Sequence, residues 1–181
     1  MGKVISMPTH TNANPGQVPS RAYTLTMCAV LAALALIFSY IEFLLPLPVP
    51  VPGIKLGFAN IAILVALYRI DWRSALVVNI VRIILAGLLF TGLTSMLYAL
   101  AGGIPGVLVM ILLKRTGVFS IFGVSVGGAA THIVGQLTLA SFVIQTGAVF
   151  VTFPMLLVSA VISGLIIAFI AHLILKALPQ K

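Results

Sequence analysis

Apolar residues fill six long stretches of this chain, and polar residues are concentrated in the short breaks between them. The stretches cover residues 22–45, 54–70, 74–90, 94–113, 119–144 and 153–178, each at least 17 residues long. About 20 apolar residues cross a bilayer as a helix, and the alternation of apolar and polar positions needed by a water-exposed helix or strand is missing. The pattern predicts an all-α, polytopic membrane protein with six transmembrane helices.

The composition supports this prediction and defines a single domain. The 181 residues are 61% hydrophobic and 7% charged, whereas soluble domains contain about 25% charged residues. Residues 1–20 are polar and contain three prolines, so we expect a flexible cytoplasmic tail there. Four prolines and Gly53 between positions 46 and 53 cannot continue a helix and end the first stretch. We therefore expect one six-helix transmembrane domain at 21–178.

The positive charge of the chain gives its orientation. The formal net charge is +8, but the basic residues lie singly at the ends of apolar stretches and form no basic face, so we expect no nucleic-acid partner. With both termini in the cytoplasm, eight basic residues lie inside against Lys55 alone outside, in agreement with the positive-inside rule. The eight are Lys3, Arg21, Arg69, Arg73, Lys114, Arg115, Lys176 and Lys181. The prediction is a multi-pass protein of the cell membrane.

Arg82 is an ionisable residue inside the third stretch. At bilayer depth such a group costs at least about 2.5 kcal/mol, so it needs an explanation. It lies nine residues after Arg73, about 13 Å along a helix, and Asn79 is on the same helical face. Arg82 and Asn79 either bind an anionic or carbonyl-bearing ligand, or the arginine is structural and bonds carbonyl groups of a neighbouring helix.

The fifth stretch contains His132 and Gln136 one helical turn apart on one face. His132 either faces a ligand or is satisfied by one interhelical hydrogen bond. Glu42 and Lys55 flank the proline-rich connection and form either an interfacial salt bridge or ligand contacts, and Asn60 is a weaker candidate.

Small residues indicate where helices approach closely. Glycines 123, 127, 128 and 135 in the fifth stretch favour packing against a neighbour. Gly102, Gly103, Pro105 and Gly106 predict a kink in the fourth stretch that lines a cavity or serves packing. Ala29 and Ala33 form a small-xxx-small pair in the first stretch, which suits docking against another helix.

Four segments resemble one known family: IEFLLPLPVPVPGIKLGFANI at 41–61, VRIILAGLLF, AGGIPG, and FGVSVGGAATHIVGQL. They resemble the Gx transporter family, also labelled heptaprenyl diphosphate synthase component I, which is similar to the S components of energy-coupling factor transporters. The resemblance implies an S-component-like bundle that captures a small molecule and docks onto a transmembrane coupling subunit with two ATPases. Ala29 and Ala33 match the docking pattern of such proteins.

The synthase label predicts aspartate-rich magnesium motifs, but Glu42 and Asp71 are the only acidic residues in the sequence. We therefore expect the chain alone not to be an enzyme. Cys28 is the only cysteine, and we expect no metal site and no cofactor.

The main hypothesis for function is a substrate-binding subunit of an uptake transporter, with a small-molecule ligand and membrane lipid as its other partners. Two alternatives stay open. One is a membrane component of quinone- or flavin-linked electron transfer, and the other is a membrane anchor for a polyprenyl diphosphate synthase.

Overall fold

The structure, a computed structural model, is all-α and describes residues 21–45 and 57–178. The described part contains six α-helices, a π-helical segment and a 3-10 segment. In chain order they are α1 (Arg21–Leu44), α2 (Asn60–Arg69), α3 (Trp72–Ala86), η1 (Gly87–Thr91), α4 (Gly92–Thr116), α5 (Ile121–Ile144), η2 (Gly147–Thr152) and α6 (Phe153–Ala177). The predicted tail at 1–20 and most of the proline-rich connection lie outside the described residues.

The helices fall in the six predicted stretches, but the second and third have different bounds. The second stretch was expected to be helical over 54–70, whereas α2 begins only at Asn60. Gly57 has a φ of 82°, which a right-handed helix does not permit, and a turn precedes Asn60. Ten residues make a helix of about 15 Å, half the thickness of a bilayer core. The third stretch is α-helical only to Ala86 and then widens into η1.

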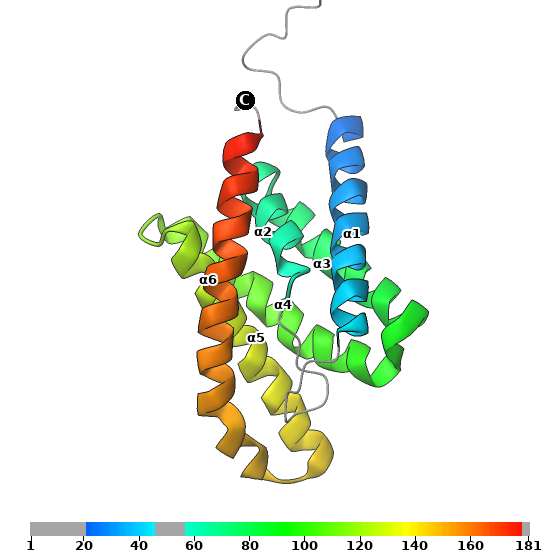
Figure 1. Ribbon diagram of the computed structural model, residues 1–181, viewed down its shortest axis with the longest axis vertical. Helices are drawn as coiled ribbons and strands as arrows, with labels where there is room; N and C mark the ends of the chain where they lie inside the picture. Colours follow the sequence, from blue (N-terminus) through cyan, green and yellow to red (C-terminus); the bar gives the residue numbers. More distant parts are fainter. Residues whose placement is uncertain (1–20, 46–56, 179–181) are drawn as a thin grey trace, which may run out of the picture.

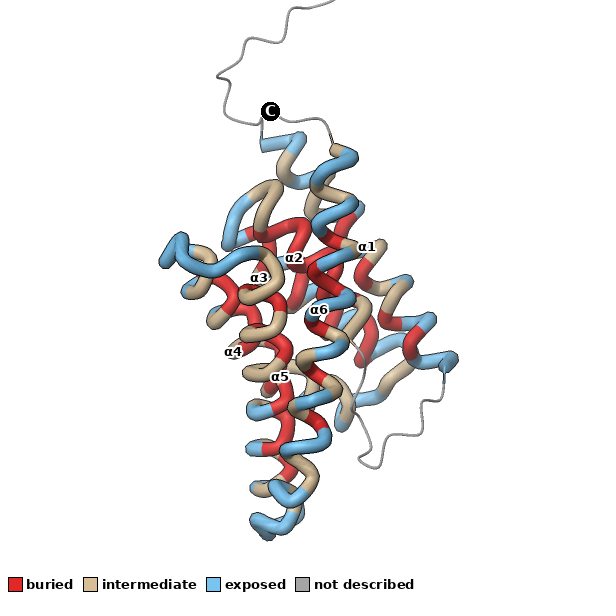
Figure 2. The backbone as a smooth tube through the Cα atoms, turned by 60° about the vertical axis from the view of Figure 1, so that its left-hand side comes forward, coloured by how far each residue is buried: buried red, intermediate tan, exposed pale blue. Residues whose placement is uncertain are grey.

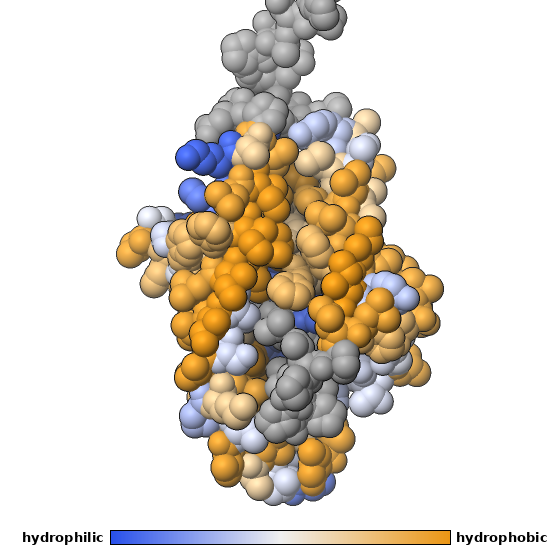
Figure 3. Space-filling view, in the orientation of Figure 1, coloured by the Kyte–Doolittle hydropathy of each residue, from blue (hydrophilic) through white to orange (hydrophobic). Residues whose placement is uncertain are grey.

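Four helical stretches are long and apolar enough to cross a membrane: Arg21–Leu44, Trp72–Thr116, Ile121–Ile144 and Gly147–Ala177. The stretch Trp72–Thr116 joins α3, η1 and α4, and the chain turns near Gly92, whose φ is 81° (Figure 1). Figure 3 shows apolar side chains covering most of the visible face along α1 and α6. The chain is therefore a multi-pass membrane protein.

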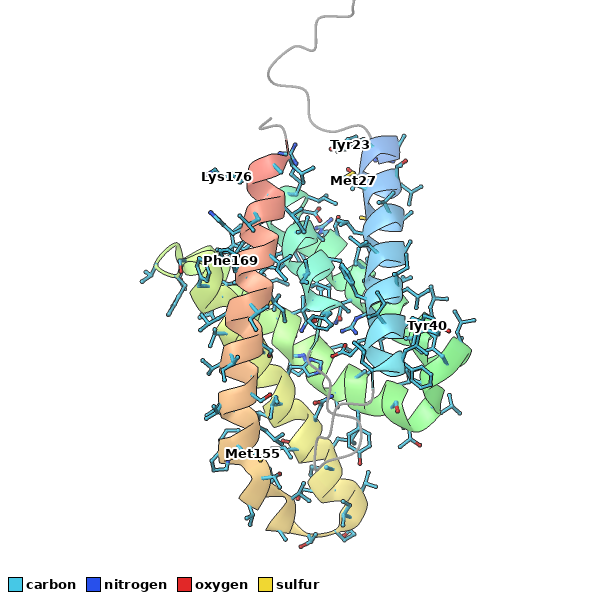
Figure 4. The ribbon with its side chains drawn as sticks, in the orientation of Figure 1. Tyr23, Met27, Tyr40, Met155, Phe169 and Lys176 are labelled. Atoms are coloured by element: carbon cyan, nitrogen blue, oxygen red, sulfur yellow. The ribbon has the colours of Figure 1, made fainter. Side chains whose placement is uncertain are left out.

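Helix α2 lies inside the bundle between α1 and α6 (Figure 1). Residues 61–67 are at most 3% exposed, and Figure 2 shows this helix buried along most of its length. A helix that is apolar on all sides is stable only when protein or lipid surrounds it completely, and here the surroundings are protein. The start of α1 and the end of α6 lie at the same end of the molecule, where Figure 4 labels Tyr23 and Lys176.

Glycines allow α4 and α5 to cross at backbone contact. A Cβ atom on Gly102 would lie 2.5 Å from the carbonyl oxygen of His132, and one on Gly106 would lie 3.0 Å from that of Gly128. The predicted packing role of the α5 glycines is confirmed at Gly128 and Gly135, where added Cβ atoms would collide with α4.

The fourth stretch stays helical through Pro105, so the kink expected there does not interrupt α4. Proline has no amide hydrogen to donate to the carbonyl of Ala101, four residues earlier. Gly135 of α5 packs directly against this carbonyl oxygen. The packing of α5 therefore covers the carbonyl group of Ala101, which receives no helical hydrogen bond from Pro105.

Candidate functional site

A polar cavity lies between the helices, and all six of them line it. The space open to the centre of a water-sized sphere is about 60 Å³, enough for several water molecules or a small polar group. Its polar lining consists of Ser39, Glu42, Asn60, Arg82, Thr91, Ser95, His132, Gln136, Ser159 and Ser163. Hydrophilic surface is visible between α1 and α6 at mid-height (Figure 3). In an apolar protein, this cavity is a candidate site for a polar ligand.

Helix α3 contributes the arginine. Arg82 is 9% exposed, and Asn79 is fully buried one turn earlier. One terminal nitrogen of Arg82 donates a hydrogen bond of 3.1 Å to Oδ1 of Asn79. Both residues belong to α3, so this bond orients the guanidinium without joining two helices. The structural reading, in which Arg82 bonds carbonyl groups of a neighbouring helix, has no hydrogen bond to support it in the described part.

Three buried polar atoms at this site have no hydrogen-bond partner among the described residues. They are Nε of Arg82, Nδ2 of Asn79 and Oγ of Ser39. A buried donor left without a partner costs about 1–3 kcal/mol, and more when the group is charged. Arg82 and Ser39 both line the cavity, so a ligand with acceptor oxygens at this site would lie next to the buried positive charge of Arg82.

Helix α1 brings a carboxylate to the same cavity. Glu42 is 6% exposed, and its Oε1 accepts a hydrogen bond of 2.6 Å from the backbone amide of Gly57. Ser39 lies one turn before it on the same face of α1. The charges of Glu42 and Arg82 interact across the cavity. The site therefore offers an anionic acceptor and a cationic donor within one enclosed space.

Helix α5 supplies His132 and Gln136, which both line the cavity on the face that α4 crosses. Gly102 of α4 touches both side chains, because a Cβ there would lie 2.8 Å from Cδ2 of His132 and 2.9 Å from Cγ of Gln136. Asn60 reaches the cavity from the first turn of α2, next to Gly57. The close packing of α4 and α5 thus fixes one wall of the site.

The structure brings together five of the residues proposed from the sequence: Glu42, Asn60, Arg82, His132 and Gln136. Asn79 lies behind Arg82 as its hydrogen-bond partner. Lys55 lies outside the described residues, so its pairing with Glu42 stays a prediction. Ala29 and Ala33 lie away from the cavity, on the exposed side of α1.

Sequence reasoning missed the small hydroxyl residues of the lining, Ser39, Thr91, Ser95, Ser159 and Ser163. Single serines and threonines are common in membrane helices because they can bond their own backbone, as Ser163 does with the carbonyl of Ala160. The spacing was nevertheless informative: Ser159 and Ser163 are one turn apart, and Ser39 is one turn from Glu42. The widening at η1 brings Thr91 to the cavity, and this the sequence pattern did not show.

No group of three histidine, cysteine or acidic residues that could hold a metal ion occurs among residues 21–45 and 57–178.

Fold and site together define a multi-pass membrane protein with a polar cavity enclosed by its helices. The family described as heptaprenyl diphosphate synthase component I matches residues 31–174, and the chain belongs to this family. No curated protein and no solved structure matches the chain significantly.

Proposed function

We propose that the protein is the membrane-embedded substrate-binding subunit of an uptake transporter, similar to the S components of energy-coupling factor transporters. The observation that carries the proposal is the cavity lined by all six helices, with the buried guanidinium of Arg82, whose Nε has no hydrogen-bond partner among the described residues. The ligand is a small molecule with acceptor oxygens, such as a carboxylate, a phosphate or a carbonyl group. Quinone-, flavin- and isoprenoid-related molecules with such groups belong to this class.

The proposed topology has six spans, with α3 and α4 as separate spans that meet at the turn near Gly92. Helix α2 then crosses only part of the bilayer as a helix and is shielded from lipid by α1 and α6. Basic residues at the start of α1, the end of α4 and the end of α6 support a cytoplasmic location of both termini under the positive-inside rule. In this topology we propose that the ligand enters the cavity from the outer side.

Transport also requires a source of energy, and the sequence contains no Walker-type phosphate loop. We propose a transmembrane coupling subunit with two ATPases as the partner. Ala29 and Ala33 are exposed and one turn apart on α1, a spacing that allows close approach of a partner helix. Leucine at both positions should prevent copurification with this partner while leaving ligand binding intact.

The test of the binding role is mass spectrometry of small molecules that copurify with the protein. Wild type is compared with Arg82→Ala and with the matched control Arg21→Ala, which removes an exposed arginine. We expect one oxygen-rich compound in the wild type and the control and its loss from Arg82→Ala. A compound retained equally by all three proteins would contradict the role of Arg82, and a wild type without any such compound would contradict the proposal.

The family description supports a second candidate, a membrane component that anchors a soluble polyprenyl diphosphate synthase. With two acidic residues, the chain does not carry the aspartate-rich magnesium motifs of the catalyst itself, and we propose that it is not an enzyme. In that case Lys114→Gln together with Arg115→Gln should release synthase activity from membranes. Unchanged membrane association would favour the transport role.

A further inference from the structure

A second polar region lies where α2, α3 and α4 end or begin, away from the cavity. The ammonium of Lys114 donates a hydrogen bond of 2.5 Å to the carbonyl oxygen of Leu67 and lies 4.7 Å from the ring centre of Tyr68. This contact holds the end of α4 against the end of α2. The region around Trp72, with Arg73, Lys114 and Arg115, is called the basic cluster below.

The indole ring of Trp72 binds two guanidinium groups that come from different helices. Arg73 lies 5.2 Å and Arg115 5.4 Å from the ring centre, within the range of a cation–π interaction. Both arginines are exposed, and 40% of the Trp72 surface is accessible. Two positive charges held near one ring repel each other, so an anion close to them would be bound favourably.

Little negative charge within the protein balances the basic cluster. Asp71 is the only carboxylate in this part of the sequence, and it accepts a hydrogen bond of 2.6 Å from the backbone amide of Ser74 at the start of α3. It also interacts with the charge of Arg73. Lys114 and Arg115 add two positive charges from a different helix. The basic residues therefore outnumber the carboxylate, and the cluster keeps a net positive charge.

Apolar surface continues from each arginine along the same helical face. On α3 the exposed apolar residues are Val77 (52%) and Val81 (37%), four and eight residues after Arg73. On α4 they are Leu112 (60%) and Leu108 (45%), three and seven residues before Arg115. A ligand at the cluster therefore has a charged group on the arginines and an apolar part along α3 and α4. A lipid fits this pattern, whereas a free phosphate ion uses only its charged end.

We propose that the basic cluster binds the headgroup phosphate of an anionic phospholipid in the inner leaflet. Arg73 and Arg115 hold the phosphate, Trp72 lies at the level of the headgroups, and the acyl chains cover the exposed residues of α3 and α4. Basic pockets between membrane helices on the cytoplasmic side commonly bind anionic headgroups, and tryptophan is frequent at this depth. The site is independent of the ligand cavity and of the proposed transport role.

The chain contains one tryptophan, so its fluorescence reports directly on this site. The full-length protein is placed in bilayers containing either brominated phosphatidylglycerol or brominated phosphatidylcholine, and quenching is titrated. We expect Trp72 to be quenched at a roughly tenfold lower mole fraction of the anionic lipid. The preference should disappear in the double variant Arg73→Gln and Arg115→Gln.

The matched control is the double variant Arg21→Gln and Lys176→Gln, which removes the same charge from other helix ends and should keep the preference. Equal quenching of the wild type by both lipids would overturn the proposal. Equal loss of preference in the two double variants would also overturn it, because net charge alone would then attract the lipid. A further arm adds millimolar inorganic phosphate, and if this abolishes the preference, the site binds free phosphate instead of lipid.

Discussion

The protein holds arginine in two contrasting environments. Arg82 is enclosed by helices, shares its cavity with Glu42 and has an Nε donor without a partner in the described part. Arg73 and Arg115 are exposed at helix ends and lie over the ring of Trp72. A buried charge has lost its water and depends on specific partners, whereas an exposed charge keeps water and is screened by salt.

This difference predicts two kinds of recognition. The cavity should select one ligand by geometry and should tolerate few substitutions. The basic cluster should attract any lipid of the right charge, with an affinity that falls as ionic strength rises. If both proposals hold, the same type of side chain serves selective ligand binding in one place and general lipid binding in the other.

The largest effect, on ligand binding, is expected when the buried Arg82 is replaced by methionine, which is long and apolar, and is compared with the same replacement at the exposed Arg115. Arg82→Met should lose the ligand, because a charge-assisted hydrogen bond contributes about 1.5–3 kcal/mol, or at least tenfold in affinity. Arg115→Met should retain it. Ligand content is measured by mass spectrometry of the purified proteins.

The thermal stability of the same variants without ligand tests whether Arg82 is structural. Among the described residues, the hydrogen bond of Arg82 is to Asn79 on its own helix, so we expect Arg82→Met to melt no more than a few degrees below the wild type. A variant that unfolds in the detergent used for the wild type would show instead that Arg82 supports the bundle.

The next largest effect concerns the wall that carries His132 and Gln136. In Gly135→Ala the new methyl group would meet the backbone oxygen of Ala101, which cannot move without moving α4. We expect the free energy of unfolding to fall by about 2 kcal/mol and ligand binding to weaken. The matched control is Gly127→Ala, where the methyl would meet the flexible end of the Leu113 side chain. Thermal unfolding of both variants should show a clear difference, and equal melting temperatures would disprove the rigid contact.

Asp71 provides a smaller effect, close to the basic cluster. Its carboxylate caps the first turn of α3, so Asp71→Ala should cost about 1 kcal/mol, while Asp71→Asn keeps a capping side chain and should cost less. Burial opposes ionisation of this group, but the hydrogen bonds from Ser74 and the charge of Arg73 outweigh it and lower the pKa of Asp71 below its ordinary value of 3.8.

The sign of the pH dependence follows from that lowered pKa. The stabilisation by Asp71 is fully present above about pH 4 and is lost as the pH falls through the folded-state pKa. The difference in melting temperature between wild type and Asp71→Ala should therefore be constant near neutrality and shrink in acid. A difference that grows in acid would contradict the capping role. Ligand retention should not change, since Asp71 does not line the cavity.

The smallest effect is expected at the contact of α5 with α6. The hydroxyl of Ser125 donates a buried hydrogen bond of 2.8 Å to the carbonyl oxygen of Gly164. Such interhelical bonds contribute about 0.6 kcal/mol on average in membrane proteins, so Ser125→Ala should lower the melting temperature only slightly. Thr138→Ala is the control, because its exposed hydroxyl bonds the carbonyl of Val134 on its own helix. A larger loss in the control would contradict this account.

The sequence predicted the all-α fold well because hydrophobicity along a membrane helix is a strong local signal. The bounds of α1, α5 and α6 lie within about two residues of the predicted stretches. The late start of α2 was not predicted, because residues 54–59 are as apolar as the helix that follows. The π-helical segment η1 was not predicted either, because an inserted π-turn depends on tertiary contacts such as the one between Gly87 and Met96.

The candidate site was partly predictable for a different reason. Arg82, His132 and Glu42 are conspicuous because polar and charged residues are rare in apolar spans. Which of these side chains lie close together depends on the order and tilt of the helices, and the sequence pattern contains neither. The exclusion of Asn79 from the cavity lining illustrates this limit, since its position one turn from Arg82 equally suited a ligand contact.

The cavity lining extends from Ser39 to Ser163, so no shorter piece of the chain can hold a ligand with the full set of contacts. A chain still being synthesised has no complete site until α6 has entered the membrane. A ligand that binds only the complete bundle stabilises it by mass action. We therefore expect the supply of ligand during synthesis to raise the amount of protein that survives quality control, which would make the cargo itself a factor in the biogenesis of its carrier.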